Sequence, residues 1–110
     1  MALDDETSYR LLKILSARPD MSQREIAREA GISLGKINYC LRVFIERGWL
    51  KANNFSSNEN KRAYVYYLTP NGVREKTLIT IRFLEQKMDE YEAIKEDILE
   101  LKREADRSLK

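Results

Sequence analysis

The side chains best suited to binding chemistry gather where a helix is predicted to begin, near residue 33. Ser33 is a predicted N-cap, which places Gly35 and Lys36 in the first helical turn. Both oppose helix formation there, because a lysine is repelled by the positive helix end and a glycine costs up to about 1 kcal/mol of helix propensity. Two such violations together indicate a site under functional demand. A glycine permits close approach of a polyanion, and a lysine supplies charge.

The outward face of this predicted helix carries side chains that can read base edges. Asn38 can pair bidentately with adenine, and Lys36 can reach guanine O6 and N7. The competing interpretation is a plain solvated surface, on which lysine, asparagine and arginine are common. The residues that we expect to contact DNA on this face are Ser33, Leu34, Gly35, Lys36, Asn38, Tyr39 and Arg42.

Two flanking segments could extend such a surface. Gln23 and Arg24 begin the preceding predicted helix, whose N-terminus can meet a phosphate. Lys61 and Arg62 close a polar loop between two predicted strands, where a hairpin tip would touch DNA backbone or minor groove. The alternatives are an ordinary helix surface for the first pair and edge-strand charge against aggregation for the second.

Composition excludes several other chemistries. The chain has 110 residues, no histidine and one cysteine, Cys40. A His-based triad, a Cys/His zinc site and an intrachain disulfide are therefore impossible. No paired carboxylates, phosphate loop or nucleophile–base pair occurs in a cleft-like context, so we expect no enzyme, catalytic residue, metal or cofactor. Cys40 falls on an apolar face, which favours a buried inert residue over a redox sensor.

Charge is distributed unevenly along the chain, although the total is only +2. Residues 18–69 carry nine basic and five acidic side chains, whereas residues 73–110 carry nine and ten. The middle of the chain could therefore face a polyanion, although its excess of +4 is modest. The sequence lacks a bilayer-length apolar run and a signal-peptide pattern, so we expect a cytoplasmic protein without membrane contact.

Three helices are predicted to position these residues. The first begins at Asp4 or Asp5 and is stopped by Pro19. The second begins with an S-x-x-E capping box at residues 22–25 and ends at Gly31. The third runs over 33–47 and ends before Gly48; its predicted inward face is Ile37, Cys40, Leu41, Phe44 and Ile45. Strands at 49–52 and 63–68 enclose the polar loop and give a hairpin. We expect Tyr66 and Leu68 to pack inward on the helices and Tyr67 to face partly outward, rather than the tyrosines to stack on bases.

A fourth helix is predicted from Pro70 to the end of the chain. Its apolar stripe repeats every 3.6 residues on average, the period of a straight α-helix. Such a stripe is too long to be buried on one small domain, so we expect it to pair with a second copy, while its first part, 73–84, could also touch the first helix. A frayed tail beyond Ile98 is the alternative. The expected dimer interface is Ile81, Leu84, Met88, Tyr91, Ile94, Ile98 and Leu101.

The order of elements predicts the fold class. Ala27, Gly31 and Ile37 have the spacing of a helix-turn-helix, and three helices followed by a hairpin form the layout of a winged helix. We therefore expect an α+β fold: a winged helix-turn-helix domain over residues 1–69, then a long C-terminal dimerisation helix over 70–110.

Several motifs resemble the MarR family of bacterial regulators: SQREIA at 22–27, GIS at 31–33, RGWL at 47–50 and LTPNG at 68–72. The string SLGKINYCL at 33–41 and the charged tail resemble the small MarR-type regulators associated with exopolysaccharide gene clusters. The resemblance implies a dimeric transcriptional regulator that binds a pseudo-palindromic operator in double-stranded DNA. MarR proteins usually have a longer N-terminal helical segment that helps to build a ligand cleft, so we expect no small-molecule effector here.

On this interpretation the helix at 33–47 enters the major groove and the wing at 53–62 contacts backbone or minor groove. The alternative is a winged-helix protein–protein interaction module that uses the long C-terminal helix as its binding surface. Salt-sensitive DNA affinity discriminates between the two functions.

Overall fold

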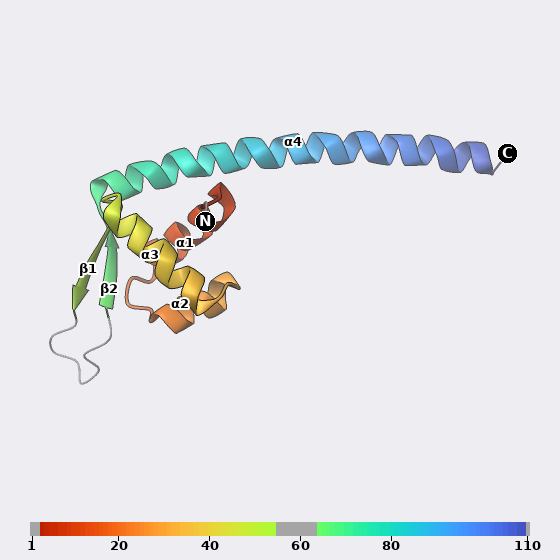
Figure 1. Ribbon diagram of the computed structural model, residues 1–110. Helices are drawn as coiled ribbons and strands as arrows, with labels where there is room; N and C mark the ends of the chain where they lie inside the picture. Colours follow the sequence, from red (N-terminus) through yellow and green to blue (C-terminus); the bar gives the residue numbers. More distant parts are fainter. Residues whose placement is uncertain (1–2, 55–63, 110) are drawn as a thin grey trace.

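The computed structural model describes residues 3–54 and 64–109 and has the predicted winged-helix fold. In Figure 1 three helices and a two-stranded hairpin gather against the first part of a long helix, whose second part extends away from them. The molecule therefore measures 73 Å in its longest direction and about 26 Å across. The elements are α1 (Asp5–Ala17), α2 (Gln23–Ala30), α3 (Leu34–Glu46), β1 (Leu50–Asn54), β2 (Tyr64–Leu68) and α4 (Pro70–Ser108).

The helices begin where short polar side chains can accept orphan backbone N–H groups. The capping box of α2 is complete, because Ser22 accepts from the backbone of Glu25 and the Glu25 carboxylate accepts from the backbone of Ser22. Gly31 then ends α2 in the left-handed conformation, with φ of 71°. The other N-caps are Asp4 for α1, Ser33 for α3 and Thr69 for α4.

A single core joins α1, α2, α3 and the hairpin, and one prediction about α3 fails there. Four of the five residues expected on the inward face of α3 are buried, but Ile45 is 40% exposed. Ile45 follows Ile37 and Leu41 at four-residue steps, and each step turns about 40° beyond a full helical turn, so Ile45 falls at the edge of the buried face. The largest fully buried side chains are Phe44, Leu11, Leu12, Leu15, Ile26, Ile37, Leu41, Ile79 and Cys40.

The hairpin is antiparallel, with Leu50 paired to Leu68 and Ala52 paired to Tyr66. Tyr66 is buried and its backbone N–H donates to the carbonyl of Pro19, whereas Tyr67 is 48% exposed. The alternation confirms the prediction that Tyr66 packs inward. β1 extends to Asn54, two residues beyond the predicted strand.

The first part of α4 packs on α1 through residues that the sequence analysis did not single out. Ile79 is 1% exposed, and the centroids of the Phe83 and Tyr9 rings are 5.3 Å apart. Arg82 donates two hydrogen bonds, of 3.1 Å each, to the Asp5 carboxylate. The predicted contact of residues 73–84 with α1 is therefore confirmed, but the side chains that make it lie off the apolar stripe.

The helical period explains this difference. Gly72, Ile79 and Phe83 share the face of α4 that is turned toward the domain. Val73, Ile81 and Leu84 lie on another face and are exposed by 54%, 48% and 57%.

Beyond Phe83 every described residue of α4 is exposed. The helix continues to Ser108, so the alternative of a frayed tail beyond Ile98 is not supported. All seven predicted dimer residues are 45–63% exposed in the single chain. An apolar stripe of this length without an intrachain partner is unusual for a soluble monomer.

Candidate nucleic-acid interface

The first half of α3 presents most of the predicted DNA-contacting residues on one exposed face. Leu34 is 43% exposed, and Gly35, Asn38 and Arg42 are exposed as well. Tyr39 is half-buried against the core. This face can follow a groove because its centre carries a glycine rather than a bulky side chain.

Nothing in the described part of the chain requires a glycine at position 35. A Cβ atom built at Gly35 would meet nothing within 4 Å, and its φ is not positive. The other three glycines are required by the fold: Gly31 and Gly48 have φ of 71° and 76°, and a Cβ on Gly72 would lie 2.0 Å from the carbonyl oxygen of Trp49. Among the described residues, neither packing nor backbone conformation therefore explains the propensity cost of Gly35.

A chain of hydrogen bonds links α3 to α2 and the hairpin. The Asn38 side-chain amide donates to Gln23 at 3.4 Å, and the Gln23 amide donates to the Tyr66 hydroxyl at 3.0 Å. Gln23 is half-buried, whereas Asn38 is exposed. Gln23 therefore links Asn38 to the hairpin, a contact that the sequence analysis did not foresee because residues 38, 23 and 66 are far apart in the chain.

Lys36 lies on the flank of α3 nearest the start of α1, not at the centre of the exposed face. It is half-buried, and its backbone N–H donates to the Ser33 hydroxyl. Hydrogen bonds from Thr7 lower the pKa of Asp4, the N-cap of α1, and the positive charge of Lys36 contributes to the same shift. The lysine side chain is long enough to turn from this flank toward a polyanion.

The outer parts of the predicted surface are described only in part. Arg24 is exposed in the first turn of α2, and Ser33 is exposed at the start of α3. Lys61 and Arg62, the predicted wing contacts, lie outside the described residues. Lys51, on the strand across the hairpin, is exposed.

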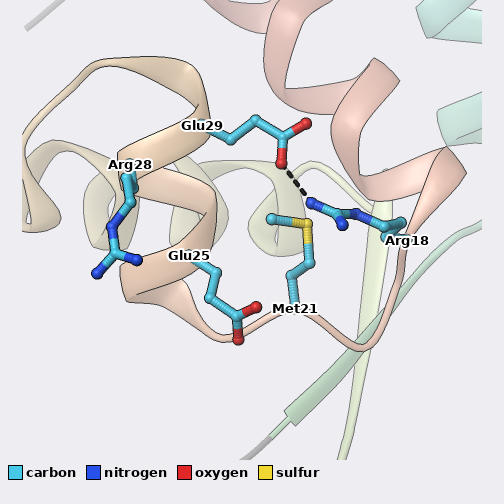
Figure 2. Close-up of a pocket in the computed structure, with 5 residues that line it drawn as sticks. All are labelled: Arg18, Met21, Glu25, Arg28 and Glu29. Atoms are coloured by element: carbon cyan, nitrogen blue, oxygen red, sulfur yellow. Dashed lines mark hydrogen bonds and ion pairs between the residues drawn. The ribbon is translucent and has the colours of Figure 1, made fainter.

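A cleft of about 320 Å³ lies between the end of α1 and α2. Figure 2 shows Met21 at its centre and the Arg18 guanidinium paired with the Glu29 carboxylate. Glu25 on its rim is already used in the capping box, and that hydrogen bonding lowers the pKa of its carboxyl group. Three of the four charged side chains that line this cleft, Arg18, Glu25 and Glu29, are thus engaged with one another or with the backbone. Nothing in the cleft pairs a nucleophile with a base.

The sole cysteine lies in the core. Cys40 is 0% exposed, and burial raises the pKa of its thiol. A raised pKa keeps the thiol protonated and unreactive at neutral pH, as the sequence analysis expected. In the described part of the chain, no three side chains of the kinds that bind metals come together.

Comparison with known proteins assigns the class of this fold. Residues 4–51 match the family described as winged helix-turn-helix DNA-binding. No curated protein matches the chain. Among solved structures, the PcaV transcriptional regulator from Streptomyces coelicolor has a TM-score of 0.66 at 21% identity, over 93% of this chain and 77% of PcaV.

Two further structures extend the likeness. The transcriptional repressor CouR, bound to a 23-mer DNA duplex, has a TM-score of 0.57 at 25% identity, over 66% of this chain and 49% of CouR. The zinc-dependent MarR family regulator AdcR has a TM-score of 0.56 at 22% identity, over 86% of this chain and 61% of AdcR.

These comparisons define the protein class as a winged helix-turn-helix fold with a long C-terminal helix, shared with MarR-type structures. The chain spans about half the length of CouR, and 55% of PcaV in complex with its natural ligand. Within the described residues, no helix combines the length and the apolar character needed to cross a membrane.

Proposed function

We propose that this protein is a transcriptional regulator that binds double-stranded DNA sequence-specifically as a homodimer. Gly35 carries the proposal, because it is the one glycine of the four that neither the backbone nor internal packing requires. It lies in the first turn of the helix that follows the helix-turn-helix corner, the position from which such folds approach base edges. The low-identity likeness to regulators, one of them bound to DNA, supports the same function.

In this mechanism α3 enters the major groove. Gly35 lets the helix backbone come close to the DNA, and Asn38, held by Gln23, pairs with a base edge. Lys36 and Arg42 supply positive charge to bases or phosphates, and Leu34 and Tyr39 make apolar contacts beside them. The N-terminus of α2, with Arg24, meets a phosphate, and Lys61 and Arg62 of the wing contact backbone or minor groove.

The exposed stripe of α4 supports the homodimer. Burial of a large apolar side chain that is half exposed is worth about 1 kcal/mol. The seven predicted interface residues, counted in both chains, therefore contribute about 14 kcal/mol before the cost of association, which is estimated at 4–15 kcal/mol. The balance permits a stable dimer. We propose that its operator is pseudo-palindromic, since each copy would read one half-site.

The proposal includes finer parts that rest on the sequence alone. The regulator is bacterial and cytoplasmic, and it controls genes of exopolysaccharide production. A small-molecule effector is not part of the proposal.

The test is fluorescence anisotropy of the full chain on a duplex from upstream of its own gene, with a scrambled duplex as control. We expect tighter binding to the native duplex and a steep loss of affinity with added salt, because Lys and Arg contacts release counterions. Equal binding to both duplexes refutes sequence-specific recognition. No binding at low salt refutes DNA binding and favours the second candidate, a protein-interaction module that uses the exposed stripe of α4.

A further inference from the structure

We infer that α4 pairs with its copy in an antiparallel direction along its whole length, with the two-fold axis crossing the helix near Asp89, its midpoint. The inference rests on the proposed dimer and states its geometry. Both orientations of a helix pair would bury the exposed stripe. The choice between them follows from the charge of the two halves of α4 and from the side on which the domain is attached.

The two halves of α4 carry opposite net charge. Residues 70–88 hold four basic and two acidic side chains, net +2, whereas residues 89–108 hold four basic and eight acidic side chains, net −4. An antiparallel pair lays each positive half along a negative half, and a parallel pair lays like halves together. Single ion pairs can be drawn in either orientation and contribute little at an exposed surface, so the difference between the halves is the stronger guide. The dipoles of two antiparallel helices attract each other and therefore favour the same orientation.

The attachment of the domain gives an independent argument. In Figure 1, α2, α3 and the hairpin strands all lie on one side of α4. Averaged along the helix, the exposed stripe is turned roughly a quarter to a third of a turn from the face that meets α1. A partner helix therefore lies beside α4 rather than across from the domain.

In a parallel pair the two-fold axis runs along the helices. With the partner beside α4, this axis sends the second domain to the opposite side of the pair, and the two copies of α3 face away from each other. In an antiparallel pair the two-fold axis runs across the helices and keeps both domains on the same side, where one duplex can contact both copies of α3.

The resulting spacing agrees with DNA. The domain is attached to α4 between Gly72 and Phe83, so its centre lies about eleven residues from Asp89. At 1.5 Å per residue, two domains related by an axis at Asp89 are about 33 Å apart along the helix. One turn of B-DNA separates adjacent half-sites by about 34–36 Å. The length of α4 thus sets the distance between the two domains that carry the recognition helices.

The same pairing places the C-terminal end of α4 against an apolar groove on the partner. Leu109 is 86% exposed at the end of the chain. Full antiparallel overlap brings it beside the start of the partner's α4, where a groove of about 230 Å³ lies among Leu15, Pro19, Tyr67, Leu68 and Val73. An apolar end residue against this apolar groove is consistent with overlap along the whole helix.

The experiment measures distances between spin labels on single added cysteines, Glu96→Cys and Arg103→Cys, in the full chain without DNA. Both sites are exposed and lie off the apolar stripe. The antiparallel pair predicts about 20 Å between labels at 96 and about 40 Å at 103, since each residue adds 1.5 Å on both sides of the axis. The unmodified chain is the control, because buried Cys40 should take no label.

Each outcome separates the inference from the proposed function. Distances that rise from 96 to 103 support the antiparallel pair. Short distances of about 20 Å or less at both sites mean a parallel pair, which overturns the inference and leaves the dimer standing. No dipolar coupling together with a monomer mass in sedimentation overturns both, while DNA binding is judged separately by anisotropy.

Discussion

Replacing Gly35 by alanine should move stability and DNA affinity in opposite directions. The added methyl group meets no atom of the chain within 4 Å, and alanine is the better helix former. We expect Gly35→Ala to raise the free energy of unfolding by up to about 1 kcal/mol, or the Tm by roughly 5 °C in a chain of this size. If the backbone at this point lies against DNA, the same methyl group holds the helix away from the groove. A loss of one close contact, about 1–3 kcal/mol, corresponds to roughly 5- to 150-fold weaker binding.

Gly72→Ala is the matched control, because Gly72 also lies in the first turn of a helix. Its Cβ would lie 2.0 Å from the carbonyl oxygen of Trp49, which already accepts the backbone N–H of Thr69. The backbone must shift, so we expect a loss of about 1–3 kcal/mol of stability. Thermal unfolding at one fixed protein concentration and anisotropy on the native duplex measure both variants. A Gly35→Ala protein that is more stable and binds DNA like the wild type would refute the assignment of this face.

The remaining predictions concern the base contact, the dimer and the corner. Asn38→Ala should weaken binding to the native duplex by about 1–3 kcal/mol and relax specificity at one base position, which binding to single-base variants of the duplex measures. Leu101→Ala should raise the dimer Kd roughly 30-fold, because about 1 kcal/mol is lost in each of two chains. Leu99 is a similarly exposed leucine off the stripe, so Leu99→Ala should leave the dimer Kd unchanged. Sedimentation equilibrium measures the dimer Kd of both variants. Ser22→Ala removes the hydroxyl that caps Glu25 and should cost about 0.5–2 kcal/mol in urea unfolding.

Each of these has an outcome that contradicts it. Equal weakening of Asn38→Ala on native and scrambled duplexes excludes a base-reading role. Equal dimer Kd values for Leu101→Ala and Leu99→Ala exclude the stripe as the interface. A Ser22→Ala protein with unchanged urea midpoint means that the capping box adds nothing to the stability of the corner.

The fold was largely predictable because its signals are local. The Ser22–Glu25 capping box, the left-handed Gly31 and Pro70 at the start of α4 act within one helical turn, and the structure has all three as predicted. The mismatch of Gly35 with its helix was also visible in the sequence. The structure then removed the remaining intrachain explanations for that glycine.

The face of a helix that meets a neighbour was not predictable in the same way. The stripe on α4 follows the 3.6-residue period, yet Ile79 and Phe83, which lie off the stripe, make the contact with α1. Ile45 fits the apolar pattern of α3 and is nonetheless 40% exposed. Apolar periodicity shows which face of a helix is apolar but not which element covers each residue of that face, because that depends on the angle at which helices cross.

The sequence by itself determined the order of the elements, the helix boundaries and the exposed stripe of α4, because capping, turn chemistry and periodicity are properties of neighbouring residues. Only the tertiary structure decided that Gln23 joins Asn38 to Tyr66, that Arg82 pairs with Asp5, and that the domain packs against the first third of α4. Those arrangements bring together residues from distant parts of the chain, and only the packing of the shared core fixes their distances.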